Sequence, residues 1–107
     1  FTNDLTPRAR YPKGRQAYVR TLVKEGATIG ANATIVCGIT IGRWAMIGSG
    51  AVVTKDVKAH ALMVGVPAKQ MGWVCECGNR LSDDLSCIKC GRNYEEQPNG
   101  LVKIHVQ

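Results

Sequence analysis

The sequence is poor in aromatic residues, in histidine and in long apolar runs. Aromatic side chains make up only 6% of its 107 residues, so a hydrophobic core must be built from Val, Ile, Leu and Ala. No apolar run approaches the roughly 20 residues that a membrane-spanning helix needs, and we expect no membrane partner. The chain begins at Phe1, without Met and without a signal-peptide pattern. We interpret this start as the cut end of a longer chain.

The formal charge of +6 is unevenly distributed along the chain. Residues 1–24 carry six basic residues and one acidic residue, residues 25–57 are balanced, and residues 58–74 add two lysines. Residues 75–107 have a net charge of −1. The positive charge before and after the balanced segment would attract anionic ligands. A solubilising surface is an equally good interpretation of any single one of these side chains.

Aliphatic residues recur at every sixth position between residues 21 and 57. A helix would show a period of 3.6, and a series of hairpins would show paired turn signals. Residues two apart lie on the same face of a strand, so each hexapeptide is predicted to form one short strand and one corner. Three such strands would make one turn of a triangular prism. The aliphatic anchors are Val23, Ile29, Ile35, Ile41, Ile47 and Val53, and their partners two positions earlier are Thr21, Ala27, Ala33, Ile39, Ala45 and Ala51.

The six anchors supply only two turns of the predicted prism. Stacked repeats bury their apolar faces only against neighbouring repeats, so two turns make a small core. We therefore expect further N-terminal turns, an end cap or other subunits to complete it.

The run TIGANATIVCGITIGRWAMIGSGAVVTKDV, followed by LMVGVPAK, resembles the hexapeptide-repeat acyltransferases. The resemblance covers residues 1–73 and implies an all-β fold, a left-handed parallel β-helix that works as a homotrimer. The left hand rests on the resemblance alone, because strand crossovers are normally right-handed. A γ-class carbonic anhydrase has the same helix but needs three histidine ligands, whereas this chain has only His60 and His105.

The start of the chain, FTNDLTPRA, resembles the branch of this family that acetylates an amino group on a nucleotide-linked sugar. The group that it resembles acts on UDP-2-acetamido-3-amino-2,3-dideoxyglucuronate. The resemblance implies that Asn3 is the catalytic residue beside the acceptor amine, and that Asn3, Asp4 and Arg8 bind the substrate. An ordinary turn is the alternative interpretation of Asn3-Asp4.

The resemblance also implies an acetyl-CoA site in the groove between subunits. Thr54, Lys55 and Lys69 match positions that contact the far end of CoA, and the backbone around Ala45 and Gly50 would line the pantetheine arm. Lysine supplies point charges for phosphates, and small residues let a thin ligand approach the backbone. Without the resemblance, both lysines would be read as plain surface residues.

Neither histidine lies in the FTND motif, where other branches place a catalytic base, and both are expected at the surface. A hydroxyl acceptor needs a base, whereas an amine with a pKa of about 7.7–8.0 is partly neutral at pH 7. Such an amine can attack a thioester directly when it is well oriented. We therefore expect Asn3 to hold an amine acceptor; a base upstream of Phe1 is the alternative.

Four cysteines are clustered as Cys75, Cys77, Cys87 and Cys90. Close cysteine pairs joined by a short loop suit a structural Cys₄ zinc site, with two disulfides as the alternative. Zinc is favoured because nothing indicates secretion and cytoplasmic thiols stay reduced. Residues 74–107 are thus predicted to form a zinc-ribbon module with few apolar residues, namely Trp73, Leu81, Leu85, Ile88 and Tyr94. Its tail, residues 100–106, has the alternation of a strand, and Cys37 is expected to be a buried, inert thiol.

Two further functions compete with an acetyltransferase. A nucleic-acid-binding ribbon would need a basic footprint, but residues 75–107 carry −1, so no nucleic acid is expected. A non-catalytic trimeric scaffold would use the same coil without binding CoA.

Overall fold

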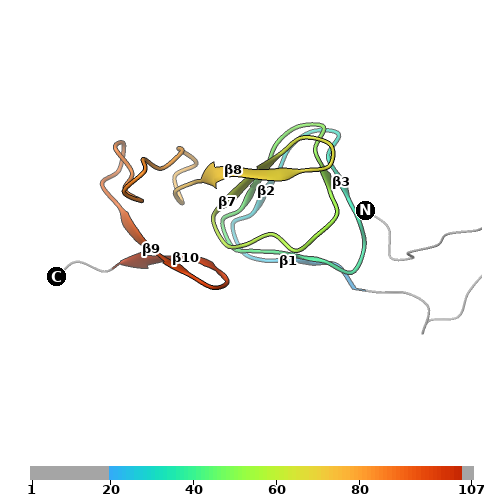
Figure 1. Ribbon diagram of the computed structural model, residues 1–107, viewed down its shortest axis with the longest axis horizontal. Helices are drawn as coiled ribbons and strands as arrows, with labels where there is room; N and C mark the ends of the chain where they lie inside the picture. The colour runs from blue at the N-terminus through green and yellow to red at the C-terminus, as the bar shows by residue number, and fades with distance from the viewer. Residues whose placement is uncertain (1–19, 105–107) are drawn as a thin grey trace, which may run out of the picture.

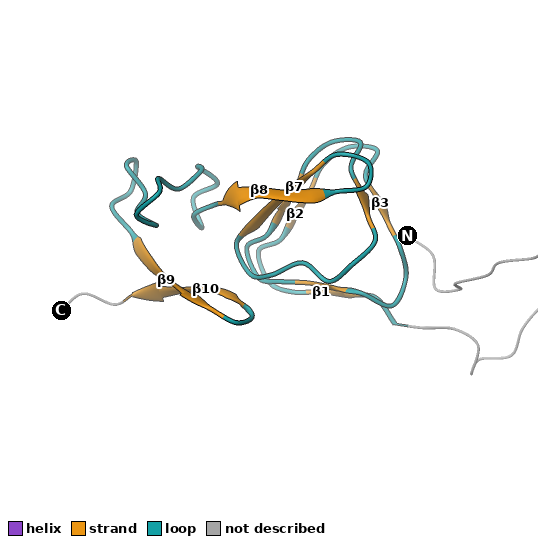
Figure 2. Ribbon diagram, in the orientation of Figure 1, coloured by secondary structure: helices purple, strands orange, loops and turns teal. Residues whose placement is uncertain are grey.

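The computed structural model describes residues 20–104, and within them every regular element is a β-strand (Figures 1 and 2). None of these residues belongs to a helix that is long and apolar enough to cross a membrane. The first six strands have two residues each: β1 Leu22–Val23, β2 Thr28–Ile29, β3 Thr34–Ile35, β4 Thr40–Ile41, β5 Met46–Ile47 and β6 Val52–Val53. The remaining four are β7 Ala61–Val64, β8 Lys69–Trp73, β9 Asn93–Gln97 and β10 Gly100–Ile104.

The first six strands wind into a three-sided parallel coil. Strand β1 pairs with β4, β2 with β5 and β3 with β6, and each pair joins residues 18 positions apart. Figure 1 shows the successive turns lying over one another around an open triangular outline. The all-β fold and the prediction of three hexapeptides per turn are therefore confirmed for the described residues.

The aliphatic anchors point into the coil, as predicted. Ile35, Ile41, Ile47 and Val53 each expose 2% of their surface or less. Their small partners Ala45 and Ala51 are equally buried, because residues two apart share the inner face. The corners repeat with the same period of six, each with a residue of positive φ: Gly26, Asn32, Gly38, Trp44 and Gly50.

The last turn of the coil is shorter than the others. Val57 bridges to Ile41, only 16 residues earlier, and β7 pairs with β5 at the same reduced spacing. Strand β8 then runs antiparallel to β7 and leaves the coil. The six-residue period therefore ends at Val53, and the coil is closed on this side by a hairpin that the repeat pattern does not predict.

Residues 74–104, which we call the cysteine-rich module, follow β8. Two short turns carry the four clustered cysteines, and β9 pairs antiparallel with β10, so the predicted strand in the tail is confirmed over Gly100–Ile104. The apolar core of the module is small and includes two of its cysteines: Cys75, Leu81, Cys87, Tyr94 and Leu101. Ile88 is 84% exposed and lies outside this core, so its predicted place there was wrong.

The module docks onto the last turn of the coil at Ala59 and His60. The backbone N–H of Ala59 donates to the Asn99 carbonyl at 3.0 Å, and the Leu101 N–H donates back to the Ala59 carbonyl at 3.1 Å. Next to this contact, His60 is only 4% exposed and its ring lies 4.7 Å from that of Tyr94. The prediction of a surface histidine at position 60 was therefore wrong, because a module far along the chain covers it.

Candidate functional site

Three of the residues predicted to bind CoA lie around one cavity. Thr54 and Lys55 come from the short corner after β6, and Lys69 begins β8 on the opposite wall. The cavity has a volume of about 350 Å³ and is lined further by Val53, Asp56, Met63, Pro67, Ala68 and Gln70. We call it the corner cavity. Its two lysines place positive charge on both walls, as phosphate binding requires.

The two small residues predicted to line the pantetheine arm lie apart from this cavity. Ala45 is 1% exposed and points into the coil, and its carbonyl accepts a hydrogen bond from the Thr28 N–H at 2.8 Å. Gly50 is exposed at a corner with φ of 74°, and a Cβ added there would meet no atom within 4 Å. A thin ligand could thus approach the backbone at Gly50, whereas Ala45 offers no exposed side chain.

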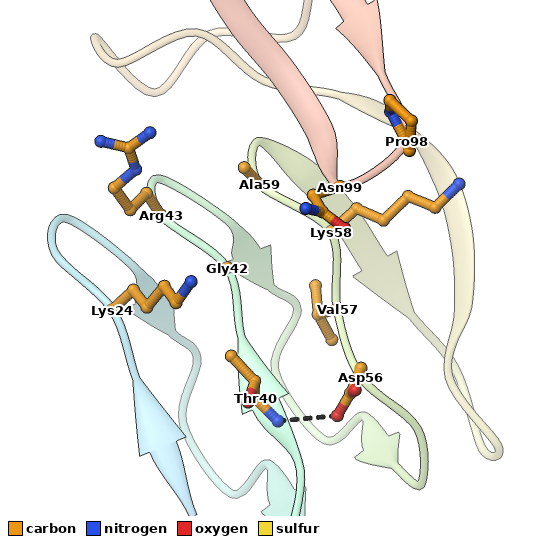
Figure 3. A pocket seen from close by; sticks show the side chains of 10 residues that line it. All are labelled: Lys24, Thr40, Gly42, Arg43, Asp56, Val57, Lys58, Ala59, Pro98 and Asn99. Carbon is orange, nitrogen blue, oxygen red and sulfur yellow. Dashed lines mark hydrogen bonds between the residues drawn. The ribbon is translucent and has the colours of Figure 1, made fainter.

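A second depression, which we call the lysine groove, lies on another face of the coil (Figure 3). Its volume is about 570 Å³, and its basic residues are Lys24, Arg43 and Lys58. Strand pairing places Lys24, Gly42 and Lys58 side by side, each directly after a paired anchor. The sequence analysis did not single out these residues; the signal was present in the 18-residue repeat but disappears where the last turn shortens.

The residues predicted to bind the acceptor, Asn3, Asp4 and Arg8, lie outside the described residues. They therefore remain predictions, as does His105. Within residues 20–104 the other histidine, His60, is held as a neutral donor. Its Nδ1–H donates to the Val74 carbonyl at 2.8 Å, and burial lowers its pKa below the usual value of 6.5. This arrangement fixes the ring between coil and module.

The four clustered cysteines bring their sulfur atoms to one point. All four Sγ atoms lie within 4.8 Å of one another, with Cys75 3.3 Å from Cys90 and Cys77 3.6 Å from Cys87. Four sulfurs at about 2.3 Å from a tetrahedral zinc would be about 3.8 Å apart. The spacing and the all-thiol donor set therefore fit a closed metal site that all four cysteines would ligate.

Hydrogen-bond donors surround this cluster as they would surround thiolates. Asn79 Nδ2 donates to Cys77 Sγ at 3.2 Å and lowers the pKa of that thiol. The Arg92 backbone N–H lowers the pKa of Cys90 to about 6, whereas burial raises the pKa of Cys75 to about 11. A cation at the centre would counter the cost of burying charge at Cys75.

The repeat matches a known family model. Residues 20–55 match the model described as bacterial transferase hexapeptide (six repeats). The chain is 46% identical over 82 residues to dTDP-3-amino-3,6-dideoxy-alpha-D-galactopyranose 3-N-acetyltransferase of Aneurinibacillus thermoaerophilus, a match that covers 75% of this chain and 43% of that protein. It is 44% identical over 68 residues to the 2,3,4,5-tetrahydropyridine-2,6-dicarboxylate N-acetyltransferase of Staphylococcus aureus, covering 64% of this chain and 28% of that one. The chain thus spans less than half the length of these relatives.

Solved structures show the same coil. The serine acetyltransferase of Neisseria gonorrhoeae superposes with a TM-score of 0.52 and 42% identity over 57% of this chain and 24% of that one. A hexapeptide-repeat-containing acetyltransferase of Vibrio cholerae, complexed with acetyl coenzyme A, gives a TM-score of 0.52 and 28% identity over 53% of this chain and 31% of that one. The six-residue period, the 18-residue strand register and these matches agree, and the chain belongs to the hexapeptide-repeat acyltransferase family.

Proposed function

We propose that the protein transfers the acetyl group of acetyl-CoA to the amino group of a nucleotide-linked amino sugar. The observation that carries the proposal is the corner cavity, which brings Thr54, Lys55 and Lys69 together on a hexapeptide coil. Support for the acceptor comes from the relative in Aneurinibacillus thermoaerophilus, whose name states an N-acetyltransferase acting on a dTDP-linked 3-amino sugar. The motif at Asn3 favours a UDP-linked sugar, so the nucleotide is the point to be tested.

The proposal includes the hand and the assembly of the coil. Family membership supports a left-handed winding and a homotrimer, in which a CoA molecule lies between neighbouring subunits. The first strand supports further burial in the whole protein, because Leu22 and Val23 are 53% and 40% exposed although their side chains occupy the apolar column of the repeat. We propose that residues 1–73 form the acyltransferase part and residues 74–107 a separate ribbon.

In this proposal the corner cavity holds the phosphate-bearing end of CoA. Lys55 and Lys69 would contact phosphate oxygens with their ammonium groups, and the Thr54 hydroxyl would donate a further hydrogen bond. The thioester would lie toward Asn3, which would hold the neutral amine for attack on the thioester carbon. The amine nitrogen forms the new amide bond, the sulfur leaves as CoA thiol, and the proton of the ammonium intermediate passes to the thiolate or to water.

The cysteine cluster supports a zinc ion with a structural role. All four ligands come from the protein, which leaves no open coordination position for a substrate. Because the apolar core of the module contains only Leu81, Tyr94 and Leu101 beside two of the cysteines, metal binding would supply much of its folding free energy.

Acetylation of a panel of amino sugars tests the acceptor. Release of free thiol from acetyl-CoA is followed with UDP-linked and dTDP-linked 3-amino sugars, with 4-amino sugars and with a hydroxyl-only nucleotide sugar. We expect turnover with a 3-amino sugar of one nucleotide and none with the hydroxyl-only compound. Turnover that requires a hydroxyl acceptor would contradict the amine proposal while leaving acetyl-CoA in place.

Lysine variants test the cofactor site independently of the acceptor. K55A and K69A are expected to weaken acetyl-CoA binding about tenfold each, measured by titration calorimetry, because each removes a phosphate contact worth roughly 1.4 kcal/mol. K89A, in an exposed turn of the module, is the matched control and should bind as the unaltered protein does. Equal affinities for all three variants would rule out the corner cavity as the CoA site.

A further inference from the structure

The inference concerns a backbone group in the coil that lacks its regular partner. The N–H groups of Leu22, Thr28 and Thr34 each donate to the carbonyl 17 residues later, which is the repeating hydrogen bond of the coil. Thr40 is the next member of this series, and its partner would be the carbonyl of Val57. That carbonyl instead accepts from the Gly42 N–H at 2.8 Å, because the last turn is two residues shorter.

A side chain takes the place of the displaced carbonyl. Asp56 Oδ1 accepts a hydrogen bond from the Thr40 N–H at 2.8 Å, and the Val57 N–H donates to the Thr40 carbonyl at 2.9 Å (Figure 3). These two bonds attach the end of the short corner, residues 54–56, to the strand beneath it. Without the carboxylate, the Thr40 N–H would lose its partner and the corner would be held at Val57 alone.

The same corner forms one wall of the corner cavity. Thr54 and Lys55 are both exposed and precede Asp56 directly, while Lys69 and Ala68 lie on the opposite wall. That wall is fixed separately, because the Ala68 N–H donates to the Val52 carbonyl at 2.8 Å. The width of the cavity therefore depends on how firmly the corner 54–56 is attached, and Asp56 supplies its side-chain attachment.

We propose that Asp56 is a positioning residue for acetyl-CoA: its carboxylate replaces a missing backbone acceptor and so sets Thr54 and Lys55 opposite Lys69. This inference rests on the proposed function. Asp56 acts by accepting a hydrogen bond, and its negative charge contributes nothing to holding an anionic cofactor. An isosteric amide, whose oxygen also accepts, can therefore replace it.

The test compares D56A with D56N in the full chain. D56A should weaken acetyl-CoA binding about tenfold, raise its KM by a similar factor and leave kcat within about twofold, because a displaced wall affects binding rather than chemistry. D56N should bind within about twofold of the unaltered protein. D83A, which removes an exposed acidic residue from the module, is the charge-matched control.

Amide hydrogen exchange separates this inference from the proposed function. D56A should speed exchange at the Thr40 N–H, and D56N should leave it protected. Equal affinity of D56A and the unaltered protein, or equal weakening by D56N and D56A, would overturn the positioning role and leave the acetyltransferase proposal intact. An unaltered protein that binds no acetyl-CoA would overturn both. If D56A does not fold, D56E decides: its longer side chain should weaken binding, and unchanged affinity would overturn the inference.

Discussion

At the scale of single residues, His60 connects the coil to the cysteine-rich module through both its backbone and its ring. Its carbonyl accepts from the Val74 N–H at 2.8 Å, and its Nδ1–H donates to the Val74 carbonyl at the same distance. The opposite face of the junction is Tyr94, whose ring packs against the imidazole and whose Oη lies 3.2 Å from Cys75 Sγ. Protonation of His60 would place a charge in this buried junction.

The stability of the protein is therefore expected to fall in mild acid. Burial lowers the pKa of His60 in the folded state below the value of 6.5 that it has when unfolded, so the unfolded state binds the proton first. Stability contributed by the neutral ring is complete above pH 6.5 and declines as the pH falls from there toward the lowered folded pKa. Urea midpoints measured between pH 7.5 and 5.5 should show this decline.

An asparagine at position 60 provides the control for this pH effect. Asn tolerates the positive φ of 65° found at His60, and its amide does not titrate. H60N should lose less stability over the same pH range under identical metal concentrations. A decline equal to that of the unaltered protein would assign the acid sensitivity to other groups.

At the scale of elements, the repeat was predictable and its ending was not. A single column such as Val23, Ile41 and Val57 gives the period in the sequence, because each inner position admits only an aliphatic side chain. The shortened last turn depends on a carboxylate substituting for a carbonyl at Asp56, and a surface aspartate gives no such signal. The burial of His60 depends on contacts with Val74 and Tyr94, which no local pattern encodes.

The aliphatic column predicts a steep difference between inner and outer turns. Ile41 is fully buried at 0% exposure, so I41A should cost about 2–5 kcal/mol in the free energy of unfolding through lost burial and a residual cavity. Val23 occupies the same column in the first turn but is 40% exposed, and V23A should cost less than about 1 kcal/mol. Urea unfolding measures both. Similar costs would show that Val23 is covered in the protein in solution.

The hairpin of β9 and β10 depends on a glycine where it meets the coil. A Cβ on Gly100 would lie 2.4 Å from the backbone nitrogen of Ala59, and φ at Gly100 is 126°. G100A should therefore destabilise the docked module by more than about 3 kcal/mol, since backbone on both sides must shift. Gly50 also has positive φ but open space around it, so G50A should cost only about 1 kcal/mol. Thermal unfolding of the two variants checks the difference, and equal costs would contradict the docking contact.

At the scale of the whole molecule, the two ends of the coil differ. The C-terminal side is covered by its own chain, since β8 pairs along β7 and the module hairpin contacts Ala59. The first strand instead leaves Leu22 and Val23 exposed. A covered end prevents edge-to-edge association of strands, so the module protects the coil on the side where its repeat stops.

Metal removal is expected to uncover this end of the coil while leaving the coil wound. The four cysteines hold the two turns of the module together, and loss of the metal would release Tyr94 and Leu101 from their small core. We expect one zinc ion per chain, and we expect a strong chelator or C87S to lower the thermal midpoint and expose His60 to solvent. C37S is the matched control, because Cys37 is buried at 3% exposure in a corner of the coil outside the cluster, and this variant should keep its zinc. Retention of zinc by C87S, or an unchanged midpoint after chelation, would show that the cysteine cluster does not depend on metal, and the junction at His60 would then have to be held by its hydrogen bonds to Val74 alone.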